Sequence, residues 1–296
     1  MAIPDNQLKV WAQPGTVQGA KNTHAAIRNA LAGHQWPDDV HYVTYLQGSY
    51  RNNTHLRRQS DVDVVVELTS LPVRDGSGLP GSQRELLARD FPEPGYGWRR
   101  FRRDVRSALA GAFGDSRVRE GKKTWKLAME SPEIPVDVVV AVRYLTYTEY
   151  SGQRKYRRTE GLGLYLPAEG RWAINYPHRH RRNGVEKEKA TNWWFRRTIR
   201  MFKNARAKLV DDGRLGPDTA RSYHIECLLY NVPNRLLAGS YQSAYSSALY
   251  WLRDNDLARF PSQDKQVLVF DRGPDSWNER DARTLINALV RQYEDW

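Results

Sequence analysis

The chain has 296 residues, of which 40% are hydrophobic and 11% aromatic, a composition typical of a folded globular protein and not of a disordered one. Its 46 Lys and Arg residues outnumber its 34 Asp and Glu residues, so a net charge of +12 favours a polyanionic partner such as a nucleotide or a nucleic acid. The single cysteine, Cys227, excludes an internal disulfide and a cysteine-based zinc site. The first residues lack the pattern of a signal peptide, and no apolar run approaches the roughly 20 residues that span a bilayer. We therefore expect a cytoplasmic protein without a membrane segment.

The first half of the chain mixes helix and strand patterns. Apolar residues at helical spacing predict helices over 16–33 and 98–114. Alternating or β-branched runs predict strands at 43–46, 62–68, 118, 125–129 and 136–142. A stretch rich in Gly, Pro and Ser predicts a loop over 73–81.

From about residue 186 the pattern becomes helical. Helices are predicted over 186–209, 222–230, 241–252 and 281–293. The basic run 178–182, His-Arg-His-Arg-Arg, is typical of a solvated loop. We expect an α+β fold with a mixed-sheet catalytic part over 1–170 and a helical part over 171–296. We expect the first helix to contact both parts.

Three aspartates lie in or beside the β-branched runs. Asp61 and Asp63 are separated by one valine, so in a strand their side chains share a face about 7 Å apart. Asp137 stands in a second valine-rich run, where an unpaired buried charge would be costly. An Asp-x-Asp pair alone is common in proteins. Three carboxylates on neighbouring strands, however, can hold two Mg²⁺ ions for phosphoryl transfer.

The pair Gly48-Ser49 follows the strand predicted over 43–46. Glycine allows the backbone to approach a phosphate closely, and serine adds a hydroxyl donor. Gly48-Ser49 is followed by an Asp-x-Asp pair that begins twelve positions after Ser49, and later by a lone Asp in a second valine run. This order predicts a metal-dependent nucleotidyltransferase.

These motifs resemble the polymerase-β type of nucleotidyltransferase, with a mixed-sheet lobe, a C-terminal helical lobe and the active site in the cleft between them. Within this superfamily the chain is similar to the bacterial cGAS/DncV-like nucleotidyltransferases (CD-NTases) of anti-phage (CBASS) systems, and to their clade E enzymes, which make pyrimidine-containing cyclic dinucleotides. The stretches that carry the resemblance are 43–67, 135–142, 172–177, 192–205 and 222–233. The last three are specific to this family, and the first two mark only the superfamily.

The resemblance implies a role for each motif residue. Asp61, Asp63 and Asp137 would hold two Mg²⁺ ions, or Mn²⁺ in their place, and Asp137 would help to activate the attacking hydroxyl. The nucleotide would be bound by Gln47, Gly48, Ser49, Asn175, Lys203 and Ser222. Among these, Ser49, Lys203 and Ser222 would hold the triphosphate, and Asn175 would read the base. A solvated helix lysine and a turn asparagine are the simpler interpretations of Lys203 and Asn175.

The implied substrates are nucleoside triphosphates such as UTP and ATP. The implied product is a cyclic dinucleotide messenger that a separate effector reads. We expect a monomer that needs neither a membrane nor a nucleic acid. Two alternatives remain open from the sequence. One is a template-independent RNA nucleotidyltransferase of poly(A)-polymerase type, which the net charge of +12 would suit. The other is an inactive RNA-binding module.

Overall fold

The computed structural model describes residues 2–57, 61–129, 136–271, 273 and 277–296. Its internal contacts divide the chain into two compact units. The sheet unit comprises Val17–Gln47 and Asp61–Pro177, and the helical unit comprises Met1–Thr16, Gly48–Ser60 and His178–Trp296. Within the described ranges, no helix combines the length and the apolar character that crossing a membrane requires.

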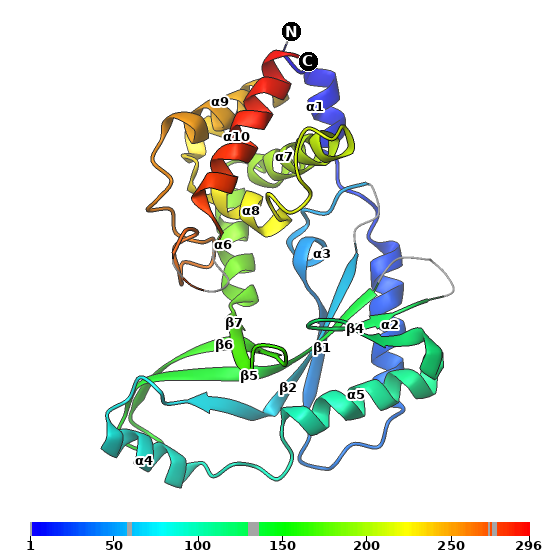
Figure 1. Ribbon diagram of the computed structural model, residues 1–296, viewed down its shortest axis with the longest axis vertical. Helices are drawn as coiled ribbons and strands as arrows, with labels where there is room; N and C mark the ends of the chain where they lie inside the picture. The colour runs from blue at the N-terminus through cyan, green and yellow to red at the C-terminus, as the bar shows by residue number, and fades with distance from the viewer. Residues whose placement is uncertain (1, 58–60, 130–135, 272, 274–276) are drawn as a thin grey trace. The chain divides into compact units, whose positions relative to one another are not determined.

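The sheet unit is built on one mixed sheet with the strand order β1-β2-β5-β4-β3 (Figure 1). From the same sheet, β6 pairs with β5, and β7 pairs with β6. The pairing of β2 with β5 is parallel, and the other pairings are antiparallel. The strands are β1 (Tyr42–Leu46), β2 (Val62–Asp75), β3 (Val118–Glu120), β4 (Trp125–Leu127), β5 (Val136–Tyr150), β6 (Tyr156–Leu166) and β7 (Arg171–Asn175).

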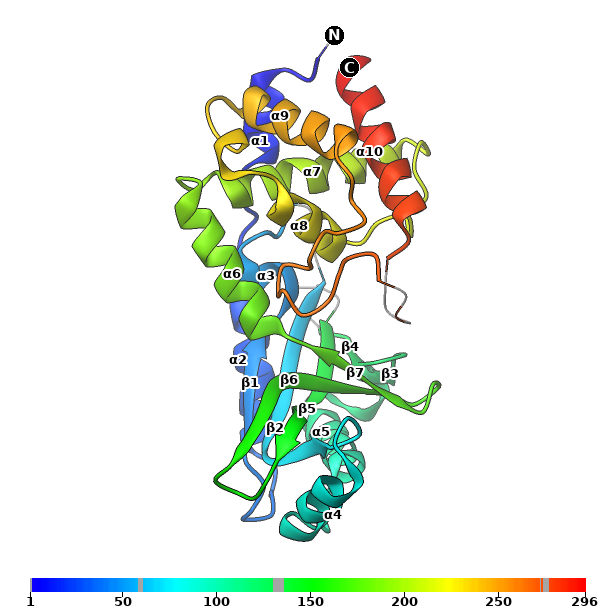
Figure 2. The same cartoon turned by 90° about the vertical axis from the view of Figure 1, so that its left-hand side faces the viewer.

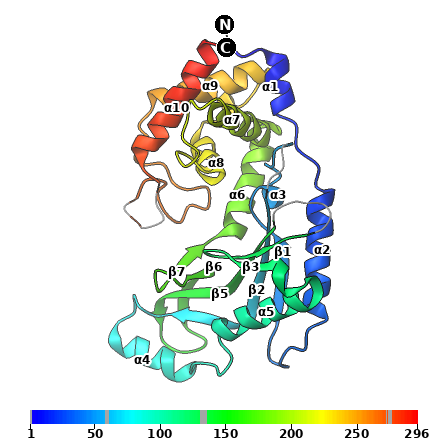
Figure 3. The same cartoon turned by 45° about the vertical axis from the view of Figure 1, so that its right-hand side comes forward.

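Three helices complete the sheet unit: α2 (Gln18–Ala32), α4 (Gly81–Asp90) and α5 (Trp98–Phe113). Helices α2 and α5 pack against each other and against the sheet (Figure 3). A short 3₁₀ turn, Asp115–Arg117, follows α5. The predicted helices and strands of this unit are confirmed, except that the strand predicted over 125–129 ends at Leu127. The loop predicted to start at Val73 is wrong at its start, because β2 pairs with β5 again from Val73 to Asp75 after a register shift.

The helical unit gathers around α7, which packs against α1, α8, α9 and α10 (Figure 2). Its helices are α1 (Asp5–Trp11), α3 (Gly48–Asn52), α6 (Pro177–Ala190), α7 (Trp194–Asp211), α8 (Ser222–Asn231), α9 (Tyr241–Asp254) and α10 (Glu279–Glu294), with a 3₁₀ turn at Asn234–Leu236. The core includes Phe202, Leu209, Tyr245 and Leu285, all of which are buried. Burial of these large apolar side chains supplies the main free energy that holds the helices together.

The single helix predicted over 186–209 is wrong, because the chain breaks between α6 and α7. Asn192 and Trp193 adopt left-handed backbone angles, with φ of 46° and 69°, and this ends α6. The first turn of α7 is then satisfied by an upstream side chain, since the Glu188 carboxylate accepts a 2.7 Å hydrogen bond from the Arg196 amide. The helical spacing of the apolar residues continues across the break, so periodicity alone did not reveal it.

Buried Arg200 explains why residues near the N-terminus belong to the helical unit. Its Nε donates to the Ala12 carbonyl oxygen over 2.5 Å, and its Nη1 donates to the Asn53 carbonyl oxygen over 2.7 Å. One side chain on α7 therefore holds two segments that are distant in sequence. The sequence suggested one division between residues 170 and 171, whereas the contacts place the change at Pro177 and add 1–16 and 48–60 to the helical unit.

Candidate active site

Asp63 and Asp137 are direct partners in the parallel pairing of β2 with β5. Neighbouring strands lie about 4.8 Å apart and register partners share a face, so the two carboxylates project together. Asp61 precedes β2 by one residue and is exposed. Burial raises the pKa of Asp63 to about 6, and repulsion from Asp137 and then from Asp61 adds to this shift. The structure thus brings the three candidate acids of the sheet unit together.

Strand β4 and the residue just before it supply two partners of Asp137 that the sequence analysis did not select. The Thr124 hydroxyl donates to Asp137 Oδ1 over 2.9 Å, and Lys126 Nζ lies 3.9 Å from the same oxygen. Lys126 is the register partner of Asp137 in the antiparallel pairing of β4 with β5. The proximity of Lys126 to Asp137 follows only from this register, because the sequence around Lys126 has the ordinary alternating pattern of a strand.

The donor set fits a hard divalent cation in its chemistry. Three carboxylates supply the oxygen ligands that Mg²⁺ prefers. Burial and then repulsion from Asp137 and Asp61 raise the pKa of Asp63, and a cation would offset both. As the side chains stand, no three His, Cys, Asp or Glu residues in the described ranges are arranged to hold a metal ion. Holding an ion would therefore require these carboxylates to move from the positions they have here.

The stretch Gln47-Gly48-Ser49 contains the point where the chain passes from the sheet unit to the helical unit. The backbone N–H of Gln47 donates to the carbonyl oxygen of Asp63 over 2.9 Å, which holds Gln47 against β2. Gln47 Oε1 is buried without a hydrogen-bond partner among the described residues. Gly48 begins α3 with φ of 62°, a left-handed conformation that favours glycine. Ser60 and Pro135, at the edges of the motifs, lie outside the described residues.

Asn175 and Ser222 both have exposed side chains at the ends of regular elements. Asn175 is the last residue of β7, where its backbone pairs with Leu162. Ser222 is the first residue of α8, at the end of the helix whose backbone N–H groups lack intrahelical partners. Both positions leave the side chain accessible to a ligand, as the predicted roles require.

Lys203, in contrast, is buried and fully engaged. Its ammonium lies 2.6 Å from Glu226 Oε1 and donates to the hydroxyl and the carbonyl oxygen of Thr54 over 3.1 and 3.3 Å. An ammonium has three N–H donors, so these three contacts use all of them. A contact between Lys203 and a triphosphate therefore requires one of these bonds to break.

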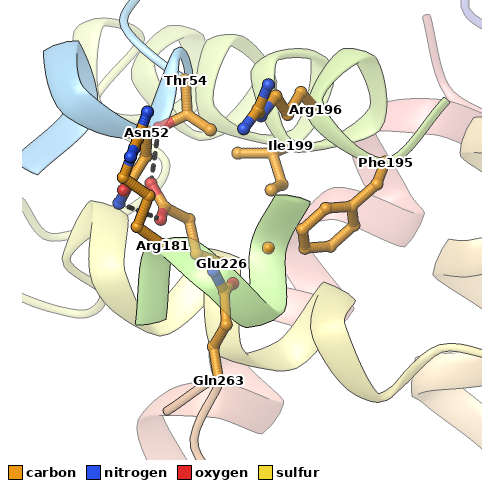
Figure 4. A pocket seen from close by; sticks show the side chains of 9 residues that line it. Asn52, Thr54, Arg181, Phe195, Arg196, Ile199, Glu226 and Gln263 are labelled. Atoms are coloured by element: carbon orange, nitrogen blue, oxygen red, sulfur yellow. Dashed lines mark hydrogen bonds between the residues drawn. The ribbon is translucent and has the colours of Figure 1, made fainter. Parts of the chain in front are cut away.

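Glu226 is the centre of this network, and Figure 4 shows its bonds to Asn52 and Thr54. Its Oε1 also accepts from the Thr54 hydroxyl over 2.6 Å, and its Oε2 accepts from Asn52 Nδ2 over 3.2 Å and from His180 Nε2 over 2.8 Å. Burial alone would raise the pKa of Glu226, but Lys203 and His180 outweigh burial and hold the pKa well below its usual range. A cavity beside Glu226 has only about 10 Å³, the room of a single water molecule, and cannot hold a nucleotide.

This network fixes the segment that follows α3. Asn52 ends α3 and Thr54 lies just beyond it, so their bonds to Glu226 attach the chain after Gly48-Ser49 to α8. The solvated loop expected over 178–182 is wrong, because these residues lie in α6 and His180 is buried against Glu226. The sequence carried no signal for Glu226, since a single glutamate in an apolar helix has no recognisable spacing.

We predict that Asp63→Asn stabilises the metal-free protein at pH 8 by about 1–3 kcal/mol, because it removes the repulsion expressed in the raised pKa. Because the pKa of Asp63 is higher in the folded protein than its unfolded value of 3.8, this residue does not lower the stability of the fold below pH 3.8. It lowers the stability most above about pH 6. The gain should therefore shrink as the pH falls from 8 to 5. Urea unfolding with a chelator present measures it.

The control for this prediction is Asp38→Asn, an exposed aspartate of the same unit. It should change stability little at either pH. Added Mg²⁺ should stabilise the wild type more than Asp63→Asn. An equal gain at pH 8 and pH 5 would contradict the assignment of a repelling carboxylate cluster.

We predict that Glu226→Gln lowers the free energy of unfolding by about 3–5 kcal/mol, because it leaves the Lys203 charge buried without its partner. Lys203→Met should cost a similar amount, and the double variant should cost clearly less than the sum of the two. The pair stabilises the fold above the unfolded pKa of Glu226, 4.5, and its contribution is lost as the pH falls below that value. Urea unfolding at pH 7.5 and 4 measures these differences.

A matched control for Lys203 is Lys208, which also lies on α7. Lys208 and Asp212 form a 3.0 Å ion pair with largely solvent-accessible side chains, and Lys208→Met should cost under about 1 kcal/mol. If Glu226→Gln proves as mild as Lys208→Met, Glu226 does not hold the segment after α3.

Comparison with known proteins identifies the family of the chain. Residues 182–294 match the model of the cGAS/DncV-like nucleotidyltransferase C-terminal helical domain. The chain is 40% identical over 298 residues to the cyclic UMP-AMP synthase of Rhodothermus marinus, with 100% of this chain and 99% of that protein covered. It is 33% identical over 302 residues to the cyclic nucleotide synthase CdnE01 of Staphylococcus haemolyticus, with both chains covered completely.

The solved structures agree with this result. The structure of the Rhodothermus marinus CdnE c-UMP-AMP synthase with Apcpp and Upnpp matches with a TM-score of 0.89 and 40% identity, covering 99% of this chain and 97% of that chain. The fold match therefore extends over nearly the full length of both chains. The chain therefore belongs to the bacterial cGAS/DncV-like nucleotidyltransferases of the CdnE group.

Proposed function

We propose that this nucleotidyltransferase joins nucleoside triphosphates into a cyclic dinucleotide that contains uridine, of the UMP–AMP or UMP–UMP type. The observation that carries the proposal is the carboxylate group formed by Asp63, Asp137 and Asp61 in a chain 40% identical to a cyclic UMP-AMP synthase over its whole length. An inactive binding module would have no use for three mutually repelling acids.

The three aspartates are proposed to hold two Mg²⁺ ions. When bound, these ions would neutralise the carboxylates and the charge that develops on the triphosphate. The Thr124 hydroxyl donates to Oδ1 of Asp137 only, so the second oxygen of this carboxylate remains to accept a proton from a substrate.

The proposed reaction has two rounds of the same chemistry. The 3′-hydroxyl oxygen of one nucleotide attacks the α-phosphorus of the other, its proton passes to Asp137, and pyrophosphate leaves. A second attack within the linear dinucleotide closes the ring and releases a second pyrophosphate. Catalysis then rests mainly on positioning and charge stabilisation.

The remaining residues are proposed to bind and orient the nucleotide. Gly48 and Ser49 contact the triphosphate through the backbone and the hydroxyl, with Gln47 beside them. Ser222 contributes a hydroxyl at the N-terminus of α8, where the helix dipole favours an anion. Lys203 acts mainly through Glu226, by holding the segment after α3 in place.

The biological setting is also part of the proposal. We propose a cytoplasmic monomer that uses UTP and ATP, needs no nucleic acid for activity, and makes a messenger read by a separate effector in anti-phage (CBASS) signalling. Its one cysteine, Cys227, is buried and unpaired, which suits a reducing compartment.

Incubation of the protein with the four nucleoside triphosphates and Mg²⁺ should give a short cyclic product that resists phosphatase and needs no primer. Mass spectrometry after phosphatase treatment measures it. The Asp61→Asn/Asp63→Asn variant is the inactive control, and Asp38→Asn should keep full activity. An RNA nucleotidyltransferase would instead give a ladder that lengthens with time and extends added RNA, and this result would overturn the proposal.

We predict that Asn175→Ser keeps overall activity but shifts incorporation from uridine towards purines by roughly tenfold to a hundredfold. A side-chain amide can donate to a uracil carbonyl and accept from its N3–H at once, whereas serine is too short for both contacts. Losing such a pairing costs about 1–3 kcal/mol. Competition among UTP, ATP and GTP measures the shift, and Asn22→Ser on α2 is the control. An unchanged base ratio would leave Asn175 as a turn residue.

A further inference from the structure

The sheet unit contains a cavity of about 460 Å³ that the proposed reaction does not use. Its lining includes Phe91, Pro92, Glu93, Pro94 and Gly97 from the connection of α4 to α5, and Val142 of β5. Val142 is five residues beyond Asp137 on the same strand, which places it about 16 Å from the carboxylates. The volume lies in the range of small-molecule sites. The cavity is therefore separate from the catalytic acids but shares β2 and β5 with them.

The cavity borders an irregularity in β2. Leu68 pairs with Val142 and Val73 pairs with Tyr144, so residues 69–72 of β2 stand opposite Arg143 alone. Leu71 and Pro72 of this stretch, and Val73 beside it, line the cavity. The cavity therefore lies where the pairing of β2 with β5 is interrupted.

Three aromatic rings form one wall. The centroids of Trp98, Tyr165 and Trp172 lie 5.1–5.7 Å from one another, and their planes are inclined by 56–74°. Inclined rings offer both a face and an edge to a flat molecule placed against them. This wall favours a planar aromatic ligand over a flexible aliphatic one.

Arg74 gives the cavity its charge. Its guanidinium lies 4.0 Å from the centre of the Phe91 ring, its Nη1 makes a long 3.4 Å bond to the Pro72 carbonyl oxygen, and its Nε is buried without a partner. Arg99 is a second cation in the lining, and Glu93 is the single acid. Within the described residues, no carboxylate lies within 4.0 Å of either arginine. A guanidinium held on a ring with a buried unpaired N–H suits a carboxylate, sulfonate or phosphate oxygen.

We propose that this cavity, defined by Arg74, Phe91, Trp98, Arg99, Tyr165 and Trp172, is a second binding site for a planar aromatic molecule that carries a negatively charged group. The rings hold the flat part and Arg74 holds the anion. A ligand there contacts the same two strands that carry Asp63 and Asp137, and it does so without occupying the nucleotide site.

The test uses a pair of fluorescent probes that differ in charge, anilinonaphthalene sulfonate and the neutral phenylnaphthylamine. The full-length wild type should bind the sulfonate at least tenfold more tightly than the neutral probe. Arg74→Met keeps the length of the side chain and should weaken the sulfonate about tenfold while leaving the neutral probe unchanged. Arg89→Met on α4 removes a largely exposed cation away from the cavity and should change neither affinity.

Location is tested separately. In fluorotryptophan-labelled protein, the fluorine resonances assigned with Trp98→Phe and Trp172→Phe should shift when the sulfonate is added. UTP with Mg²⁺ should not displace the probe. The proposal is overturned if Arg74→Met binds the sulfonate as the wild type does, if neither resonance moves, or if UTP displaces the probe in proportion to its own binding.

Discussion

The parallel pairing of β2 with β5 is the constraint on which the candidate active site depends. It is the one parallel pairing among the described strands, and its register sets Asp63 opposite Asp137. A shift of a single residue would turn one of these carboxylates to the opposite face of the sheet. The valine runs on both strands are buried on both faces of the sheet, so the pairing of Asp63 with Asp137 lies within the apolar core. Burial, and then repulsion from the neighbouring acids, raises the pKa of Asp63.

The sequence predicted this part of the molecule well because its signals are local. Valine runs mark β2 and β5, and an Asp within each run is conspicuous against apolar neighbours. The partners of Asp137 were missed for the opposite reason. Thr124 and Lys126 acquire meaning only when β4 pairs with β5, and a three-residue strand has no sequence pattern that fixes its register.

The helical unit shows a second limit of sequence patterns. Apolar spacing runs through Asn192 and Trp193 although the helix ends there, since left-handed backbone angles do not alter the hydrophobic pattern. The role of Glu226 could not be predicted either. Its partners Asn52 and Thr54, His180, and Lys203 come from three separate stretches of the chain. Such a network is a property of the packed structure and not of any segment.

Glu226 and Asp63 are carboxylates in opposite surroundings, and the contrast follows from what each carboxylate does. Glu226 has every oxygen lone pair directed at a donor, so its charge is compensated within the protein and its pKa is low. Asp63 has acids as neighbours, so its charge is uncompensated and its pKa is high. A fully compensated carboxylate fixes a segment, but it has no affinity left for a cation. An uncompensated cluster costs stability, and that same free energy is returned when a cation binds, so the instability of the acids is the source of their affinity for metal.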